Sequence, residues 1–235
     1  MGEDIMDHFM AITATFAEHR DPEKARGMAH YMRDQFLFYG IQATQRRQLS
    51  RPWLKIERKQ PIDWRLIDQC FAAAERELQY FACDYLRRRT CYLTYEDLPH
   101  IKTLLMTKSW WDTVDSLVKV LGQMALADPR VATMMVTWGT DPNLWVRRAA
   151  IEHQLGLKDR TNQVRLATII TANLGQDEFF INKAIGWALR EYSKTDSDWV
   201  RNYLAEYQGQ LAPLSVREAS KYLWACKENL KHGIL

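Results

Sequence analysis

The feature that most constrains the fold is the recurrence of apolar residues at every third or fourth position, with no long alternation of apolar and polar residues. Two such stripes consist of Leu117, Val118, Val120, Leu121 and Met124, and of Val164, Leu166, Ala167, Ile169 and Ile170. This spacing places apolar side chains on one face of an α-helix. Neither Asn-Gly nor Asp-Gly, the pairs typical of tight β-hairpins, occurs in the chain. The pattern therefore predicts an all-α protein.

Prolines divide this pattern into short helices. Asp-Pro occurs at Asp21-Pro22, Asp128-Pro129 and Asp141-Pro142, and each pair predicts a helix start because Asp caps helices and Pro fits their first turn. Pro61, Pro99 and Pro213 are interpreted in the same way. Helices are expected at 4–19, 22–37, 44–59, 62–74, 76–92, 96–106, 110–126, 129–138, 142–155, 161–174, 178–193, 197–208 and 214–229.

Taken in pairs, these helices repeat at the spacing of HEAT-like helical hairpins, about 35–40 residues. The expected architecture is a curved α-solenoid of antiparallel helix pairs, in which every second helix lines a concave surface that basic residues make positive. A compact all-α bundle is the alternative. No Gly/Ser/Pro-rich linker interrupts the chain, so residues 1–235 are expected to form a single domain.

Composition excludes several classes of protein. Hydrophobic residues make up 47% of the chain, which supports a sizeable core, but no run of about 18 apolar residues predicts a membrane span. The first ten residues are acidic and lack the basic stretch of a secretory signal. Cys70, Cys83, Cys91 and Cys226 form no CxxC pair, so buried thiols in a reducing cytoplasm, the bacterial cytosol or nucleoid, are expected.

The distribution of charge is more informative than its sum. The net charge is only +3, yet basic residues cluster at Arg46, Arg47 and Arg51, at Lys55, Arg58 and Lys59, at Arg87, Arg88 and Arg89, and at Arg147 and Arg148. Such clusters are typical of nucleic-acid binding, although each one alone is also compatible with a solvated helix face. There is no Walker loop, GxGxxG, GxSxG or HExxH motif, and the six histidines are scattered, so neither a cofactor nor a metal is expected.

The segment SWWDTVDS, residues 109–116, combines two tryptophans with two carboxylates. Ser109 and Asp112 have the spacing of a capping box at a helix start. Trp111 and Asp115 are four residues apart and therefore lie on one helix face, whereas Trp110 is expected to pack. From spacing alone, Asp115 is as compatible with a structural ion pair as with catalysis.

Three further segments combine aromatic and basic residues. In NLWVRRAAI, Arg148 is suited either to bidentate contact with a phosphate or to a carboxylate partner, while Trp145 is compatible with the core. In FFINKAIGWALREYSK, Lys183, Trp187 and Arg190 share one face, and Gly186 indicates a close approach by another element. In the third segment, Tyr31 ends a helix before the aromatic turn at Gly40, and Thr44 is expected to cap the next helix, which carries Arg46 and Arg47.

Together, YMRDQFLFYGI…QRR, KSWWDTVDS, LWVRRAAI and FFINKAIGWALREYSK resemble the DNA alkylation repair family, the AlkD-like HEAT-repeat alkylpurine DNA glycosylases. The resemblance covers about residues 7 to 220. It implies a monofunctional glycosylase of base excision repair that removes cationic alkylpurines, such as N3-methyladenine and N7-methylguanine, from double-stranded DNA. We also expect a monomer that needs no cofactor and does not bind membranes.

The resemblance also implies roles for particular residues. Asp115 would stabilise the oxocarbenium-like sugar and orient water, and Trp111 and Trp187 would contact the lesion nucleotide. Tyr31 and Arg148 correspond to the family's DNA-contacting positions. The basic side chains at Arg47, Lys183 and Arg190 are expected to bind DNA as well. The alternatives are a HEAT-repeat protein that binds damaged or branched DNA without cleaving it, and a protein-interaction scaffold.

Overall fold

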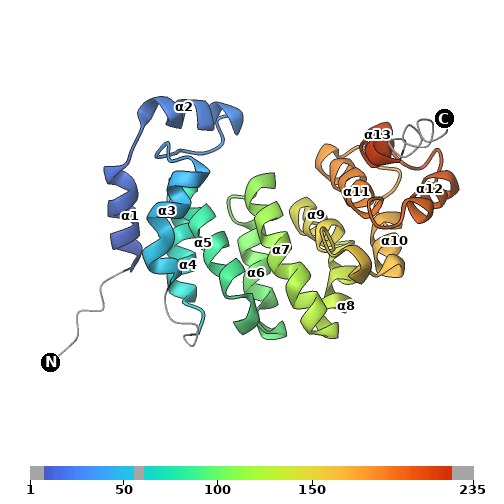
Figure 1. Ribbon diagram of the computed structural model, residues 1–235, viewed down its shortest axis with the longest axis horizontal. Coiled ribbons are helices and arrows are strands. Elements are labelled where there is room, and N and C mark those ends of the chain that lie inside the picture. Colours follow the sequence, from blue (N-terminus) through green and yellow to red (C-terminus); the bar gives the residue numbers. More distant parts are fainter. Residues whose placement is uncertain (1–7, 56–60, 224–235) are drawn as a thin grey trace, which may run out of the picture. The chain divides into compact units, whose positions relative to one another are not determined.

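The structure, a computed structural model, describes residues 8–55 and 61–223 (Figure 1). These residues form thirteen α-helices, α1 to α13, together with short 3-10 turns, and no β-strand. The prediction of an all-α protein is confirmed. None of the described helices is both long and apolar enough to cross a membrane. The chain forms two compact units, Met1–Leu93 and Thr94–Leu235, which are described in turn.

The first unit contains five α-helices. They are α1 (His8–Glu18), α2 (Pro22–Tyr31), α3 (Ala43–Leu54), α4 (Trp64–Ala72) and α5 (Arg76–Arg88). The helix α5 packs on α3 and α4, and α1 packs on the same two helices. Phe16, Phe71 and Phe81 are buried between them. Apolar burial of this kind is the main stabilising contribution to such a unit.

A buried carboxylate holds the aromatic segment between α2 and α3. Glu77, which is completely buried, accepts hydrogen bonds from the backbone N–H groups of Tyr39, Gly40 and Ile41 at 3.0, 2.9 and 3.0 Å. Burial raises the pKa of Glu77, while the three N–H groups counteract that rise. The segment is therefore extended and fixed to the start of α5.

Three predicted helices in this unit extend too far, and the one predicted at 76–92 ends at Arg88. The helix predicted at 22–37 ends at Tyr31, because Arg33 and Asp34 adopt positive φ angles of 55° and 56°. The helix predicted at 44–59 runs from Ala43 to Leu54 and has Gln42, not Thr44, at its N-cap. Residues 56–60, including Arg58 and Lys59, lie outside the described residues.

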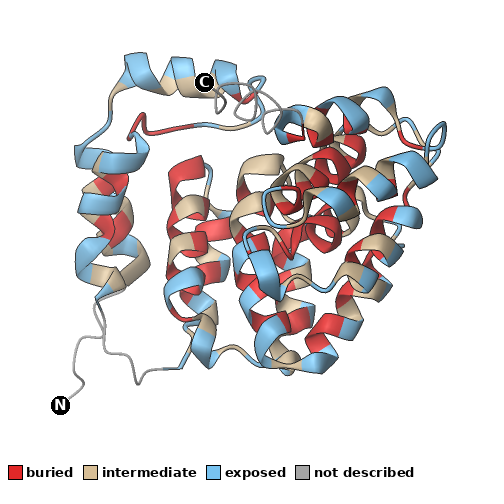
Figure 2. Ribbon diagram, turned by 45° about the vertical axis from the view of Figure 1, so that its right-hand side comes forward, coloured by how far each residue is buried: buried red, intermediate tan, exposed pale blue. Residues whose placement is uncertain are grey.

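The second unit contains the other eight α-helices. They are α6 (Leu98–Met106), α7 (Trp111–Ala127), α8 (Pro129–Trp138), α9 (Leu144–Glu152), α10 (Gln163–Thr171), α11 (Phe179–Tyr192), α12 (Ser197–Glu206) and α13 (Pro213–Ala219). The helix α9 packs against both α7 and α11, and α11 packs closely on α13. Seven of the nine residues of α9 are buried, two of which, Arg148 and Glu152, are charged types. Buried residues are concentrated where these helices meet (red in Figure 2).

The Asp-Pro pairs begin helices at two of three places. Asp21 and Asp128 are N-caps whose side chains accept hydrogen bonds from backbone N–H groups in the first turns of α2 and α8. The third prediction is wrong, because α9 begins two residues after Pro142 and is capped by Asn143. Asp141 instead accepts a hydrogen bond from the Asn143 N–H at 2.8 Å. An Asx turn therefore precedes this helix and displaces its start.

The close approach predicted at Gly186 is confirmed. A Cβ added there would lie 2.6 Å from Cβ of Glu218 and 2.9 Å from the carbonyl oxygen of Ser215, both on α13. The glycine thus allows α11 and α13 to pack at short range.

Consecutive helices pack as pairs in both units, for example α4 with α5 and α7 with α8, as expected for HEAT-like hairpins. The concave basic surface and the single domain remain predictions.

The cysteine prediction is confirmed in part. Cys70 and Cys83 are buried, and burial raises the pKa of the Cys70 thiol well above its usual value. The prediction is wrong for Cys91, which lies exposed in a 3-10 turn after α5. Cys226 lies outside the described residues.

Replacing Gly40 by alanine should destabilise the first unit. Gly40 has a φ of +93°, and an added Cβ would clash with the backbone carbonyl oxygen of Asp21. We expect Gly40→Ala to lower the free energy of unfolding by about 3 kcal/mol or more. Urea denaturation would measure this change.

The matched control is Gly27→Ala in α2, where the new methyl group meets no atom within 4 Å. This variant should gain roughly 0.5–1 kcal/mol from helix propensity. Equal stability of Gly40→Ala and the unchanged protein would contradict the tight approach.

Candidate functional site

The candidate site is built around Arg148, an arginine whose side chain is only 4% exposed. Its Nε and Nη2 atoms donate to Oδ1 and Oδ2 of Asp115 at 2.9 and 3.0 Å. Its Nη1 donates to the carbonyl oxygen of Phe180 at 2.8 Å. One guanidinium on α9 therefore binds α7 and α11 together, and the bidentate pairing fixes the orientation of the Asp115 carboxylate.

Asp115 lies in the second turn of α7, four residues after Trp111, so the two side chains share a helix face as predicted. The predicted capping box is wrong. The N-cap is Trp110, and the Ser109 hydroxyl instead donates to the carbonyl oxygen of Leu105 at 2.7 Å, at the end of α6. The Asp115 side chain remains 16% exposed, so it is not completely closed off from solvent.

A second carboxyl, which sequence reasoning did not identify, lies beneath this pair. Glu152 is completely buried, and its Oε1 lies 2.9 Å from Nη2 of Arg148. Neither oxygen of Glu152 accepts a hydrogen bond. Burial, together with the nearby Asp115, raises the pKa of Glu152 well above its usual value, although Arg148 counteracts this. Its spacing of four residues from Arg148 was the available signal.

The charge of Arg148 is maintained by these carboxyls. Burial alone would lower the pKa of the guanidinium, but Glu152 and Asp115 raise it. Arg148 is therefore a permanently charged group inside the unit. The alternative that the sequence left open, in which Arg148 pairs with a carboxylate, is what the structure shows.

Three aromatic rings pack beside this cluster. The ring of Trp110 lies 5.7 Å from that of Trp145 and 5.1 Å from that of Phe180, and Trp145 lies 4.8 Å from Phe180. The prediction that Trp110 packs is confirmed, and Trp145 is the buried member of this cluster, whereas Trp110 and Phe180 are half-buried. These rings connect the starts of α7, α9 and α11 and thereby fix the surroundings of Arg148.

Trp111 and Trp187 are both half-buried. Trp187 follows Phe180 by seven residues on α11, which places it on the same helix face about two turns further along. The structure thus brings Asp115 and Arg148 into direct contact and places each tryptophan on a helix that Arg148 binds.

The basic residues of α11 are paired within the protein. Lys183 and Arg190 each lie 2.7 Å from a carboxylate oxygen of Glu218 on α13, and Lys221 lies 2.8 Å from the same carboxylate. Although burial opposes it, hydrogen bonds and charge from Lys183 and Lys221 lower the pKa of Glu218 to about 2. This group, here called the Glu218 cluster, contains three cations and one anion.

The two candidates in the first unit are exposed. Tyr31, at the end of α2, is 70% exposed. Arg47 on α3 is also exposed, whereas its neighbour Arg46 is buried and lies 3.0 Å from Asp84. Of these two neighbouring arginines, Arg47 is the one at the surface, and it is also the one that the sequence analysis selected for DNA binding.

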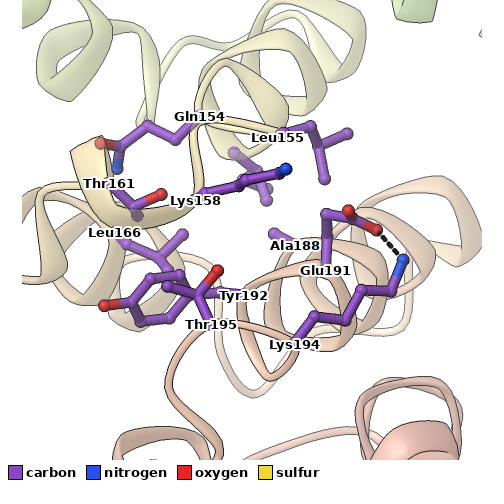
Figure 3. A pocket seen from close by; sticks show the side chains of 12 residues that line it. Gln154, Leu155, Lys158, Thr161, Leu166, Ala188, Glu191, Tyr192, Lys194 and Thr195 are labelled. Carbon is purple, nitrogen blue, oxygen red and sulfur yellow. Dashed lines mark hydrogen bonds and ion pairs between the residues drawn. The ribbon is translucent and has the colours of Figure 1, made fainter.

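A separate cavity of about 300 Å³ lies between the ends of α9 and α11 and the start of α10 (Figure 3). Glu191 and Lys194 form an ion pair of 2.6 Å at one side of it. None of the predicted site residues lines this cavity. Within the described ranges, no group of three or more His, Cys, Asp or Glu residues could hold a metal ion.

Comparison with known proteins identifies the family of this chain. A family model described as "DNA alkylation repair enzyme" matches residues 12–223. The chain belongs to the DNA alkylation repair enzyme family. As a member of that family, the protein is a repair enzyme for alkylated DNA. No curated protein matches the chain.

Solved structures show the same relationship. A predicted DNA alkylation repair enzyme from Enterococcus faecalis is 37% identical, with a TM-score of 0.82, and the match covers 87% of this chain and 97% of that one. AlkD2 from Streptococcus mutans is 18% identical, with a TM-score of 0.58, and the match covers 85% and 98%. The smu.31 protein of Streptococcus mutans UA159 is also 18% identical, with a TM-score of 0.57, and the match covers 76% and 92%. The last two similarities concern the fold alone.

The Glu218 cluster predicts a pH-dependent contribution to stability. Because its folded pKa of about 2 lies below the usual value, the contribution is complete above about pH 4.5 and is lost as the pH falls towards 2. At pH 7, Glu218→Gln should lose about 2–3 kcal/mol of unfolding free energy, and this deficit should shrink at acid pH.

Urea denaturation at several pH values would measure the difference. Glu206→Gln, at an exposed position on α12, is the control and should have little effect at any of them. A deficit for Glu218→Gln that stays constant down to pH 2 would contradict the prediction.

Proposed function

We propose that this family member is a monofunctional DNA glycosylase that hydrolyses the N-glycosidic bond of cationic alkylpurines in duplex DNA. N3-methyladenine and N7-methylguanine are the expected lesions. The observation that carries this proposal is the Asp115 carboxylate, which Arg148 holds through two hydrogen bonds and whose side chain remains 16% exposed. Preorganised charge of this kind is what a cationic transition state requires.

The chemistry needs few protein groups. Alkylation at N3 or N7 gives the purine a positive charge, so the base takes the bonding electrons and departs neutral when the C1′–N bond breaks. The sugar then resembles an oxocarbenium ion, as in other glycoside hydrolyses. The Asp115 carboxylate stabilises that cation and accepts the proton of the water that forms the new C1′–O bond. No strong general acid is required.

Arg148 acts in this proposal as a positioning residue. Its bonds to Asp115 and to the Phe180 carbonyl engage the guanidinium within the protein, and its side chain is almost completely buried. A direct phosphate contact would have to reach a side chain that is only 4% exposed. We therefore assign Arg148 to orienting Asp115 rather than to holding DNA.

The tryptophans and the remaining basic residues are assigned to the nucleic acid. Trp111 and Trp187, both half-buried, present ring faces that attract the cationic nucleotide by roughly 0.5–2 kcal/mol. Lys183 and Arg190 belong to the Glu218 cluster, which retains a surplus of positive charge for DNA phosphates. Arg47 and Tyr31 are exposed for contact with the DNA backbone.

The competing function is a HEAT-repeat protein that binds damaged or branched DNA without cleaving it. The buried clamp on Asp115 favours the enzyme, because a binding surface alone gives no reason to place a carboxylate where DNA phosphates would be repelled.

The decisive assay is release of free N7-methylguanine from an alkylated duplex. We expect the unchanged protein to release the base, and Asp115→Asn to release it about 10²–10³ times more slowly while binding the duplex with similar affinity. Single-turnover rates and a filter-binding titration would measure both quantities. No release by the unchanged protein, together with tight salt-sensitive binding, would favour the competing function.

Asp112→Asn is the matched control, since it removes a carboxylate three residues earlier on the same helix. Its rate should stay within about threefold of the unchanged protein if the effect depends on the carboxylate that Arg148 binds rather than on the charge of α7 as a whole. Equal losses in both variants would contradict the role of Asp115.

A further inference from the structure

Glu152 presents a physical problem that the proposed function does not explain. A completely buried carboxylate with no hydrogen bond to either oxygen is strongly disfavoured in a protein interior. Arg148 lies close enough for an ion pair, but its guanidinium is directed at Asp115 and Phe180. Glu152 is satisfied more simply as a neutral carboxylic acid, which has an O–H group to donate.

The geometry identifies the acceptor of that proton. Nη2 of Arg148 lies 3.0 Å from Oδ2 of Asp115 and 2.9 Å from Oε1 of Glu152, so the two carboxyls are neighbours around one nitrogen atom. Burial first, and then the negative charge of the nearby Asp115, raise the pKa of Glu152. Two carboxyls that share a site cannot both ionise at ordinary cost, and they commonly share one proton.

Several other charged or titratable groups near α9 are paired or neutral. His153, the next residue, is buried, and burial lowers its pKa to about 4, so it is uncharged at neutral pH; Arg165 of α10 acts in the same direction. Several charged side chains on the other helices that pack against α9 form ion pairs. Lys102 of α6 pairs with Asp141, and Arg130 of α8 pairs with Asp128. Lys183 and Arg190 of α11 both pair with Glu218. The charges that act on Glu152 are Asp115 and Arg148.

We propose that Glu152 is a positioning residue that carries a proton and donates it in a hydrogen bond to Asp115. This inference rests on the proposed function, because it concerns the carboxylate assigned there to the sugar cation. The cluster then contains one carboxylate, one guanidinium and one neutral acid, and its net charge is zero. Asp115 is then held by Arg148 and by Glu152, while its side chain stays partly exposed.

Ionisation of Glu152 would disturb this arrangement. A second anion would compete with Asp115 for Nη2 of Arg148 and would repel the Asp115 carboxylate. Removal of the side-chain polar group would leave Asp115 with one supporting partner in place of two. Either change should lower turnover without changing the surface that contacts DNA.

The first test reads the protonation state directly and needs no glycosylase activity. The infrared spectrum of the full chain at pH 7 should show the C=O stretching band of a neutral carboxylic acid that is missing from Glu152→Gln. In urea denaturation, Glu152→Gln should gain stability relative to the unchanged protein as the pH rises above about 4.5, because a raised pKa destabilises the ionisable form there. An unchanged infrared spectrum, or a loss of stability in Glu152→Gln, would overturn the proposal.

The second test compares single-turnover release of N7-methylguanine by two variants. Glu152→Gln keeps a hydrogen-bond donor and should stay within about threefold of the unchanged protein, whereas Glu152→Leu should be about 10–100 times slower with similar affinity for the duplex. The rate of the unchanged protein should fall at alkaline pH as Glu152 ionises, and that fall should be absent in Glu152→Gln. Equal losses in both variants, or none in either, would overturn the proposal.

The two tests separate the two levels of inference. The infrared spectrum could show a neutral Glu152 while the protein releases no base. That result would support the proton on Glu152 and contradict the proposed glycosylase activity. Should Glu152→Leu fail to fold, Glu152→Gln and the pH profile still decide, because neither depends on removing the polar group.

Discussion

The burial of one positive charge organises the second unit. A guanidinium in a protein interior is tolerated only when its donors are satisfied and its charge is balanced. Arg148 meets both requirements by binding Asp115 on α7 and the Phe180 carbonyl on α11, so the spacing of three helices depends on it. The aromatic cluster of Trp110, Trp145 and Phe180 excludes water from the same region, which strengthens the ion pair. The packing of α7, α9 and α11 and the position of the Arg148 charge therefore depend on each other.

The first unit uses a buried charge in a different way. Glu77 binds three consecutive backbone N–H groups and holds the extended segment that leads from α2 to α3. The sequence predicted the existence of α2 but not its end at Tyr31. The residues that stop it, Arg33 and Asp34, carry no Gly or Pro signal, and Glu77 lies more than thirty residues away. Local patterns predict helices well, whereas tertiary contacts set several of their boundaries.

The candidate site was predictable to a similar degree. Spacing alone placed Trp111 with Asp115 on one face, and Gly186 correctly indicated the approach of α13. The partner of Arg148 stayed open, because a separation of 33 residues between it and Asp115 has no local signature. The same holds for Glu218, which pairs with Lys183 and Arg190 from another helix. Of the two carboxyls beside Arg148, only Glu152 could have been identified from the sequence, because it follows Arg148 by four residues on the same helix.

The Asp115–Arg148–Glu152 cluster also makes the fold tolerant of the loss of Asp115. Replacing Asp115 removes the negative charge that helps to keep a proton on Glu152, while Arg148 remains beside it and favours ionisation. Glu152 can then release its proton and become the counterion that the buried guanidinium needs. A chain of this kind could lose the carboxylate that we propose acts on the sugar and still keep its helices packed, so chemistry and folding can change independently during the divergence of the family.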